Sequence, residues 1–505
     1  MKHSKIALLV TAAIFASSSA YASDNNSATV GQTGNDNAVT ITQQADSTSN
    51  SASVTQAGDF NTSSVTQSGS SNGAIISQGD DSNFADVNQI SSGNSATVNQ
   101  GGSTLGTGNS AYVNQDGMNG IVTVDQTGNS NSASAYQDSG SDGATIDIDQ
   151  VGDSNSANGY SYYSGVGSTA TINQTGNSNY GYASTHGTGD TSSVTQLGDN
   201  NSGSAVSYYD NSSAVIDQEG DSNSATAYAG YDQASVTIGQ LGDDNYAYGQ
   251  TYGTNDSISI DQSGDDHSAD VRAYYGSDNE LNVTQTNLNN DATVYTDGVG
   301  NTVNSYQYGQ DGTVNIYQLG DSNNAYTYQT SAGTHTVDID QVGNSNSAYG
   351  GSYYAGDDST STVDQSGNSN YGSAYTYGAG STATVNQTGD SNIGSTQAWY
   401  DGSTASVEQT GDSNYASASA GSEASNVDIM QEGELNDAYG TTYGTGDGID
   451  IDQTGSDHYA SVLVGDFSGG NNMVTVTQTD MNNSATVSSY GSNNQVTVLQ
   501  GAAPQ

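Results

Sequence analysis

The stretch "STATVNQTGDSN" (residues 381–392) decides the fold, because the chain repeats it. Near-copies are "STATINQTGNSN" at 168–179 and "STASVEQTGDSN" at 403–414. Along "STATVNQ" the Ser, Ala, Val and Gln share one parity, and the remaining residues share the other. A period of two with β-branched residues predicts a strand with one buried face. The glycine of "TGDS" suits a positive-φ turn, so each half of the repeat is expected to be one strand and one turn.

The glutamine of this phrase recurs at a regular interval over residues 116–505. Sixteen such anchors occur there, most of them 22 to 24 residues apart, and all have Val or Ile two positions earlier. Over residues 23–115 the interval is 11 residues, and glutamine occurs in both halves of the repeat. A 22-residue unit therefore consists of two 11-residue half-units. Beyond residue 116 one half keeps its glutamine and the other is rich in tyrosine.

Residues 1–22 differ from the repeats. Lys2 and Lys5 form a basic start, residues 6–16 are an apolar run, and small residues flank a cleavage position at 20–22. This pattern predicts a secretory signal peptide that is removed from the mature protein. The apolar run is too short to span a membrane. We therefore expect a mature chain outside the cytoplasm, with no membrane insertion.

The composition narrows the function classes. The chain has 54 Asp and Glu against three Lys and Arg, a net charge of −51, and no cysteine. Nucleic acid and anionic membranes are poor partners for such a chain, and disulfides are excluded. No Ser/His/Asp, Cys/His or paired-His spacing is visible, and carboxylates recur at every turn instead of forming one distinctive pair. We expect no enzyme activity and no cofactor. The turn carboxylates are either solvated charges that keep the chain soluble, which is the favoured interpretation, or specific Ca²⁺ ligands. Weak, non-specific Ca²⁺ binding is compatible with the favoured interpretation.

A single rung of two strands cannot be stable alone. It offers two or three small inward side chains, worth about 1.5–3 kcal/mol each, whereas ordering its backbone costs about 1–2 kcal/mol per residue. Stacked copies offset this cost, because backbone groups then pair with the rungs about 4.8 Å above and below. Buried amide side chains satisfy one another in ladders. The predicted fold class is all-β: a two-strand-per-rung β-solenoid with 22-residue rungs and amyloid-like stacking.

Two ladders are expected to hold the stack together and to support self-assembly. The predicted glutamine ladder is Gln126, Gln150, Gln174, Gln196, Gln218, Gln240, Gln262, Gln341, Gln365, Gln387, Gln409, Gln431 and Gln453. The predicted asparagine ladder, five residues after each anchor, is Asn131, Asn155, Asn179, Asn201, Asn223, Asn245, Asn346, Asn370, Asn392, Asn414 and Asn436. His267 and His458 occupy the same offset, and we expect each to fill an asparagine slot.

The motifs "SATVGQTGNDNAVTITQ" (27–43) and "SVTQSGSSNGAIISQ" (64–78) carry Gln, Gly, Asn and a second Gln at fixed spacing. They resemble the curlin repeat of bacterial curli subunits. The resemblance covers essentially the whole mature chain and implies a secreted, self-assembling, amyloid-like fibre subunit of a biofilm matrix. It also implies export through a dedicated outer-membrane channel and nucleation by a related minor subunit. The chain departs from that family in its length, in repeats that start directly after the signal peptide, and in glutamine-poor second strands.

Tyrosine is concentrated in those second strands. Many tyrosines fall six, eight, ten or twelve residues after an anchor, the parity opposite to that of the inward asparagine. This predicts an outer aromatic face. It is either a by-product of good strand formers or an adhesive, lateral contact surface. Its predicted members are Tyr162, Tyr208, Tyr252, Tyr274, Tyr353, Tyr377, Trp399 and Tyr443.

The interval breaks between Gln285 and Gln318, which are 33 residues apart, the length of three half-units. Gln307 lies between them, 22 residues after the first and 11 before the second. If all three half-units are strands, the Val-x-Gln strand moves to the opposite sheet after Gln285, and the aromatic face moves with it. Alternatively, residues 297–307 loop out. Tyr306 and Gln307 suit a strand, which favours the switch.

The leading interpretation is an extracellular fibre subunit. The alternative is a monomeric cell-surface β-solenoid adhesin, or an ice-binding or cation-binding rod. Ice binding requires regular outward threonine, but the slot before the anchors holds Asp, Asn, Thr, Ser and Glu. The strand "VTVLQ" (496–500) runs almost to the C-terminus and predicts an open edge there, which favours end-to-end assembly.

Overall fold

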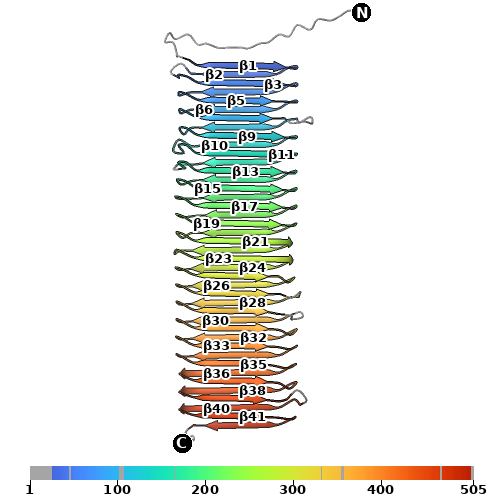
Figure 1. Ribbon diagram of the computed structural model, residues 1–505, viewed down its shortest axis with the longest axis vertical. Coiled ribbons are helices and arrows are strands. Elements are labelled where there is room, and N and C mark those ends of the chain that lie inside the picture. Colours follow the sequence, from blue (N-terminus) through green and yellow to red (C-terminus); the bar gives the residue numbers. More distant parts are fainter. Residues whose placement is uncertain are drawn as a thin grey trace, which may run out of the picture. The chain divides into compact units, whose positions relative to one another are not determined.

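The computed structural model describes residues 25–44, 47–101, 107–163, 165–330, 333–353, 358–466 and 469–501. Within these ranges every regular element is a β-strand (Figure 1). The described part of the chain contains no helix long and apolar enough to cross a membrane. The predicted signal peptide, residues 1–22, lies outside the described residues.

The chain divides into two compact units, residues up to Gln240 and residues from Leu241 onward. Each is described by itself. The change in repeat type at residue 115 is a separate feature, and it stays a prediction.

The first unit contains two series of strands. The odd-numbered strands are β1 (Ser27–Thr33), β3 (Ser51–Ala57), β5 (Gly73–Gln78), β7 (Ser95–Gln100), β9 (Ile121–Thr127), β11 (Thr145–Val151), β13 (Thr169–Thr175), β15 (Thr191–Leu197) and β17 (Ser213–Glu219), with β19 (Ser235–Leu241) at the unit boundary. The even-numbered strands are β2 (Ala38–Gln43), β4 (Thr62–Gln67), β6 (Phe84–Gln89), β8 (Ser110–Gln115), β10 (Ser132–Gln137), β12 (Ser156–Ser161), β14 (Tyr180–Thr185), β16 (Ser202–Ser207) and β18 (Ser224–Ala229).

The second unit repeats this arrangement. Its even-numbered strands are β20 (Tyr246–Thr251), β22 (Ser268–Tyr274), β24 (Asp291–Asp297), β26 (Thr313–Leu319), β28 (Thr336–Val342), β30 (Thr360–Ser366), β32 (Thr382–Thr388), β34 (Thr404–Thr410), β36 (Asn426–Glu434), β38 (Gly448–Ser456), β40 (Met473–Met481) and β42 (Gln495–Gln500). Its odd-numbered strands are β21 (Ser257–Asp265), β23 (Glu280–Leu288), β25 (Thr302–Gln307), β27 (Asn324–Gln329), β29 (Ser347–Ser352), β31 (Tyr371–Thr376), β33 (Ile393–Ala398), β35 (Tyr415–Ala420), β37 (Asp437–Thr442), β39 (Tyr459–Val464) and β41 (Ser484–Ser489).

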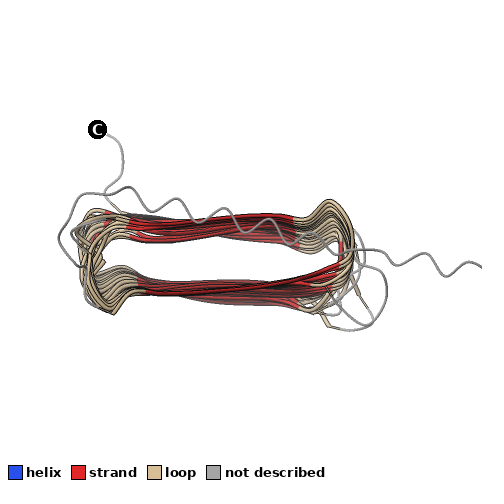
Figure 2. Ribbon diagram, turned by 90° about the horizontal axis from the view of Figure 1, so that it is seen from above, coloured by secondary structure: helices blue, strands red, loops and turns tan. Residues whose placement is uncertain are grey.

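Each strand pairs in parallel and in register with the strand two places further along. In the pair β13–β15, for example, Gln174 lies opposite Gln196 and Ile172 opposite Val194. Within a unit the odd strands form one sheet and the even strands the other. Figure 2 shows the two nearly flat sheets face to face, joined by turns at both edges. The predicted β-solenoid of two strands per rung is therefore confirmed.

The alternation of each strand sets what is buried. Ile172 and Val194 are fully buried, whereas Tyr208 stands half-buried on the outside. The sheets approach closely because large inward side chains face small ones. A Cβ added to Gly181 would lie 2.6 Å from Cγ2 of Ile172, and one added to Gly203 would lie 2.6 Å from Cγ1 of Val194. The glutamine-poor strands are thus rich in glycine and alanine because the opposite sheet fills the space.

The turn glycine two residues after the anchor has little freedom to change. Gly176 has φ +124°, and a Cβ there would lie 1.9 Å from the carbonyl oxygen of Gly198 in the next rung. The two anchors without this glycine have Asn287 and Asp480 instead, and these adopt φ values of 78° and 77°. Backbone stacking, as well as the positive φ, therefore selects glycine at this position.

The predicted change of sheet is confirmed within the second unit. All three half-units after Gln285 are strands, namely β24, β25 and β26. Gln285 on β23 pairs with Gln307 on β25, in the odd sheet. Gln318 lies on β26 and pairs with Gln341 on β28, in the even sheet. The alternative, in which residues 297–307 loop out, is wrong.

Candidate functional site

The anchor glutamines form directed chains of side-chain hydrogen bonds. Gln174 donates its Nε2–H to Oε1 of Gln196 at 2.9 Å, and Gln196 donates in turn to Gln218 at 2.8 Å. Nε2 of Gln196 also donates to the backbone oxygen of Tyr180 on the facing sheet, at 2.9 Å. Both hydrogens of the buried amide are therefore used. The predicted ladder glutamines are all buried: Gln126, Gln150, Gln174, Gln196, Gln218, Gln240, Gln262, Gln341, Gln365, Gln387, Gln409, Gln431 and Gln453.

A second glutamine ladder in the first unit is missing from the predicted set. It runs along the even strands through Gln43, Gln67, Gln89, Gln115 and Gln137, with bonds of 2.9 Å. The 11-residue interval of the early repeats was the available signal. Beyond Gln137 this slot in the first unit holds Ser161, Thr185, Ser207 and Ala229. The hydroxyl groups bond to hydroxyls across the rung, as Ser207 does to Ser192 at 2.9 Å.

The predicted asparagines hold the turns together. Oδ1 of Asn155 accepts the backbone N–H of Asn179 at 3.0 Å, and Nδ2 of Asn179 donates to the carbonyl of Gly198 at 2.8 Å. Each asparagine thus connects the turn before it and the turn after it. All eleven predicted members are buried: Asn131, Asn155, Asn179, Asn201, Asn223, Asn245, Asn346, Asn370, Asn392, Asn414 and Asn436.

The two histidines at the asparagine offset fill that slot, as predicted. Nδ1 of His458 accepts the backbone N–H of Asn483 at 3.3 Å, and the N–H of His458 donates to Oδ1 of Asn436 at 3.1 Å. Nδ1 of His267 accepts from Asn290 in the same way, at 3.2 Å. An accepting Nδ1 must be unprotonated. Burial lowers the pKa of His267, which fits a neutral ring.

The turn carboxylates accept specific hydrogen bonds, which neither sequence interpretation included. Oδ1 of Asp199 accepts the backbone N–H of Asn177 at 2.7 Å and its side-chain amide at 3.0 Å. Oδ1 of Asp221 likewise accepts the N–H of Asp199 at 2.7 Å. These bonds run from each rung to the rung before it. Among the described residues no group of three or more His, Asp or Glu side chains is placed to hold a metal ion. Calcium binding stays a prediction.

The outer aromatic residues form columns along the Gln-poor strands. The rings of Tyr377 and Trp399 stack at 4.2 Å between centroids, with their planes 8° apart. In the first unit His186 stacks between Tyr162 and Tyr208, at 5.0 and 4.0 Å. All residues predicted for the outer aromatic face are half-buried or exposed on the outside of the sheets: Tyr162, Tyr208, Tyr252, Tyr274, Tyr353, Tyr377, Trp399 and Tyr443.

His186 was missed as a member of its column. It lies twelve residues after Gln174, the offset that Tyr162 and Tyr208 have from their own anchors. The offset was the available signal, but the predicted set contains only tyrosine and tryptophan. Burial lowers the pKa of His186 to about 4.

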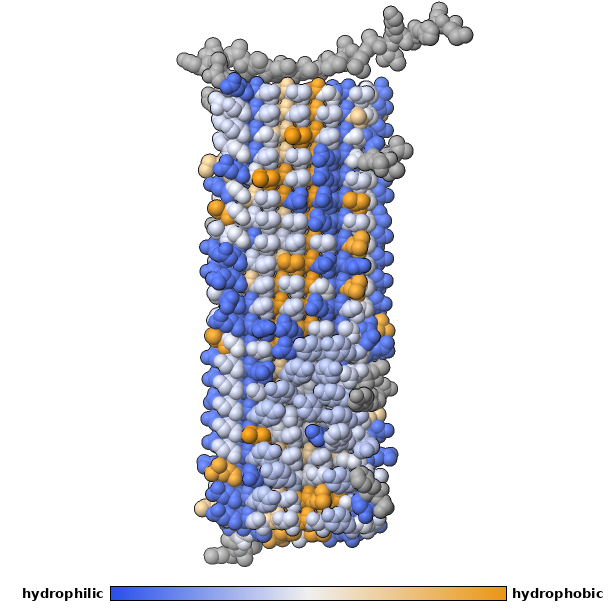
Figure 3. Space-filling view, viewed as in Figure 1, coloured by the Kyte–Doolittle hydropathy of each residue, from blue (hydrophilic) through white to orange (hydrophobic). Residues whose placement is uncertain are grey.

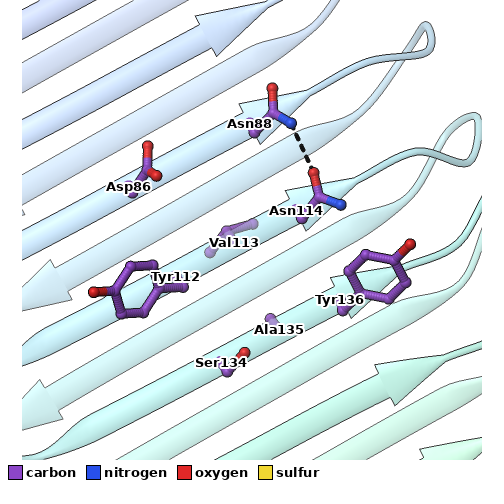
Figure 4. Close-up of a pocket in the computed structure, with 8 residues that line it drawn as sticks. All are labelled: Asp86, Asn88, Tyr112, Val113, Asn114, Ser134, Ala135 and Tyr136. Atoms are coloured by element: carbon purple, nitrogen blue, oxygen red, sulfur yellow. Dashed lines mark hydrogen bonds between the residues drawn. The ribbon is translucent and has the colours of Figure 1, made fainter.

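The aromatic column has a shallow gap on the outer face of β6, β8 and β10 (Figure 4). This depression of about 370 Å³ lies between Tyr112 and Tyr136. Ser134 pairs with Tyr112 and has no ring to continue the column. Asn88 donates to Asn114 at 2.8 Å along its margin. None of the predicted site residues lines this depression.

The family comparison matches the repeated geometry. Six segments match the curlin associated repeat: residues 24–44, 48–79, 253–286, 335–367, 356–389 and 444–479. No protein of curated function matches the chain. Curlin repeats build curli-type structural subunits, and the matched segments come from both units. The matched segments cover about a third of the chain, and they show that it carries curlin associated repeats within the stacked rungs and amide ladders of both units.

Proposed function

We propose that the chain is a secreted structural protein that assembles end to end into an amyloid-like fibre of a bacterial biofilm matrix. One observation carries this proposal: the first and last rungs that the structure describes leave inward side chains partly exposed, and their odd-numbered strands begin with the same four residues. The first strand reads "SATVGQT" and the last strand of the same sheet series reads "SATVSS".

The open rungs expose side chains that interior rungs bury. In the first rung Val30 and Ile41 are only half-buried, whereas Val54 in the next rung is fully buried. In β42, the last strand, Val496 and Val498 are likewise half-buried. Covering these side chains with a second molecule removes apolar surface from water, as each interior rung does.

The ladders give the two ends opposite polarity. Gln43 donates to Oε1 of Gln67, so its own Oε1 is directed toward the open N-terminal side. Gln478 donates to Oε1 of Gln500, which places the amide nitrogen of Gln500 toward the open C-terminal side. A head-to-tail contact would set Gln500 on Gln43 of a second molecule and extend the ladder. A contact between two N-terminal ends would instead bring together the Oε1 atoms of two Gln43 side chains, and both of these atoms are acceptors.

The finer parts of the proposal follow the curlin resemblance and the sequence. Secretion rests on the predicted signal peptide. A minor subunit as nucleator and an outer-membrane channel for export are the expected partners. Adhesion through the outer aromatic face is part of the proposed function, and a monomeric adhesin or rod is the competing assignment.

The C-terminal edge provides the test. Met473 donates its N–H to Asn494 in the next rung, and it pairs with Gln495. Alternate residues of a parallel ladder bond to opposite sides, so the N–H groups of Gln495, Thr497 and Leu499 face the open side. The double variant Thr497→Pro/Leu499→Pro removes two of these donors, and Thr497→Ser is the matched control.

We expect electron microscopy of the mature chain to show fibres longer than one molecule for wild type and Thr497→Ser. The proline variant should stay as single particles with an unchanged β-sheet circular dichroism spectrum. Wild-type particles that never elongate would favour the monomeric adhesin or rod. Elongation of the proline variant at the wild-type rate would contradict stacking through this edge.

A further inference from the structure

The two outer faces of the second unit differ in charge. Between β25 and β35 the outward side chains of the odd strands are tyrosine and uncharged polar residues, with Ile393, and none within these strands is charged. Trp399 follows β33 directly. On the even strands of the same rungs, Asp338, Asp340 and Asp364 point outward. One face is therefore aromatic and uncharged, and the opposite face is acidic.

The first unit has the same division. The outward side chains of β12 to β18 include Tyr160, Tyr182 and Tyr228 and no carboxylate. The facing odd strands carry Asp147 and Asp217 outward. Each unit thus has a stretch of uncharged aromatic surface, on the sheet opposite the Val-x-Gln strands of the same rungs. In the second unit the stretch begins at β25, because β20 to β26 place their tyrosines on the even sheet together with Asp270 and Arg272.

Charge decides how two copies can approach each other. The chain carries a net charge of −51, so contact between two acidic faces is opposed by repulsion between many carboxylates. The aromatic faces avoid this repulsion. Figure 3 shows a broad area of side chains of intermediate hydropathy on the visible face of the second unit, the colour range of tyrosine and serine.

The aromatic face is also ordered before any partner arrives. Tyr328 packs on Tyr353 at 5.3 Å, Tyr353 on Tyr377 at 5.4 Å, and Tyr377 on Trp399 at 4.2 Å. Rings held by their neighbours lose little rotamer freedom on binding. A second copy presents rows of rings with the same rung spacing, so two such faces match along their length, as in the paired sheets of amyloid.

We propose that two copies of this chain associate side by side through their uncharged aromatic faces, with β25 to β35 of one copy packed on the same strands of the other. This lateral contact is distinct from end-to-end stacking, because it uses the sheet surface and leaves the open rungs free. It identifies a second copy of this chain as the occupant of the aromatic face.

A pair of matched variants tests the proposal. Ser395 and Ser417 are registered neighbours on the aromatic face, and Thr384 and Ser406 are registered neighbours on the opposite face. All four side chains are half-buried and point outward. Ser395→Asp/Ser417→Asp and Thr384→Asp/Ser406→Asp therefore add the same number of charges. Ser406 also pairs with Asp428, so the opposite-face variant carries at least as much repulsion inside the molecule as the aromatic-face variant.

The first readout is the number of filaments per bundle in electron micrographs of the mature chain. The second is sedimentation equilibrium of the chain before any fibre forms, which reports lateral dimers even if end-to-end assembly fails. We expect the aromatic-face variant to lose at least about tenfold in lateral pairing, and the opposite-face variant to pair like wild type. Equal pairing in both variants, or equal loss in both, would overturn the proposal.

A measurement on wild type covers the case in which the variant does not fold. Mixed unlabelled and ¹⁵N-labelled chains are photo-oxidised to join neighbouring tyrosines, and mixed-isotope peptides are identified by mass spectrometry. Cross-links between chains should concentrate on Tyr328, Tyr353 and Tyr377. Tyr163 and Tyr275 are 77% and 73% exposed but lie outside residues 302–420, the segment from β25 to β35. Equal yields at these two tyrosines, or filaments that stay single while binding a neutral glucan through the aromatic face, would reject the second copy as occupant.

Discussion

The indole ring of Trp399 lies 4.2 Å from the ring of Tyr377, measured between centroids, with the two planes 8° apart. The two residues follow equivalent strands in adjacent rungs, β31 and β33, which pair in register. The rung spacing of a parallel sheet is close to the stacking distance of aromatic rings, so residues repeated at the same slot stack without further adjustment. The same relationship explains why a histidine fits into the column of the first unit.

Trp399→Ala should loosen the rungs around it. The substitution removes the stacking on Tyr377 and part of the buried area of a ring that is 41% exposed, for a local cost of about 1–2 kcal/mol. Amide hydrogen exchange of β31 to β35, followed by mass spectrometry, measures this cost. Tyr400→Ala is the control, because Tyr400 is 55% exposed in the adjoining turn and its loss should cost less than about 0.5 kcal/mol. Equal exchange in the two variants would show that stacking contributes nothing.

Gln196→Leu should destabilise the first unit strongly, although leucine is close to glutamine in size. It leaves Nε2 of Gln174 and Oε1 of Gln218 without their ladder partner inside the first unit. Unpaired buried amide groups cost about 1–3 kcal/mol each, so we expect a loss of about 2–4 kcal/mol in the free energy of unfolding. Urea denaturation of the soluble mature chain is the measurement. The control is Gln397→Leu, at an outward half-buried position, where a change below about 0.5 kcal/mol is expected.

Much of this architecture was predictable because the same constraint recurs in every rung. The parity of "STATVNQ" predicts the buried face, and the 33-residue interval from Gln285 to Gln318 predicts the change of sheet, since strand pairing permits only whole half-units. The predicted ladder residues all lie at buried positions for the same reason.

What sequence reasoning missed depends on geometry between rungs. Asp199 was interpreted through its charge, yet its oxygen accepts the backbone N–H of Asn177, a contact that only the stagger of adjacent turns creates. Asn279 and Asn301 form a further part of the asparagine ladder, with Oδ1 of Asn279 accepting the N–H of Asn301 at 2.9 Å. They lie 17 and 16 residues after Gln262 and Gln285, at the other turn of the rung, so an offset of five from the anchor glutamine did not find them.

The acidic outer row should make the second unit less stable as pH rises. Burial, and then neighbouring carboxylates, raise the pKa values of Asp340 and Asp364, and burial raises that of Asp338. A folded-state pKa above the unfolded value means that the folded state holds protons longer. The contribution of these three carboxyl groups to the stability of the folded state is therefore complete below their unfolded pKa near 3.8. It is lost as pH rises through their raised pKa values in the folded state.

The triple variant Asp338→Asn/Asp340→Asn/Asp364→Asn should be more stable than wild type at pH 7 and equal to it near pH 3.5. Thermal melts across this range test the expectation, with Thr362→Asn/Thr384→Asn as an uncharged control on the same face. Fibre formation should follow the same trend and be faster near pH 4 than near pH 8. A triple variant with the wild-type pH profile would show that these carboxylates do not repel one another in the stack.

His186 should act on the first unit in the opposite direction. Burial in the aromatic column lowers its pKa to about 4, whereas an unfolded histidine titrates near 6.5. Between these values the unfolded chain binds a proton that the folded chain does not, so the stability contribution is complete above about pH 6.5 and decreases as pH falls toward 4. The loss should reach about 2–3 kcal/mol at the lower end.

His186→Tyr keeps a ring between Tyr162 and Tyr208 and removes the titration, so the difference in melting temperature between variant and wild type should grow as pH falls from 6.5 to 4.5. Tyr208→Phe, which retains both the column and the imidazole, should show no such growth. A difference between His186→Tyr and wild type that stays constant with pH would mean that the imidazole accepts its proton inside the column at no cost.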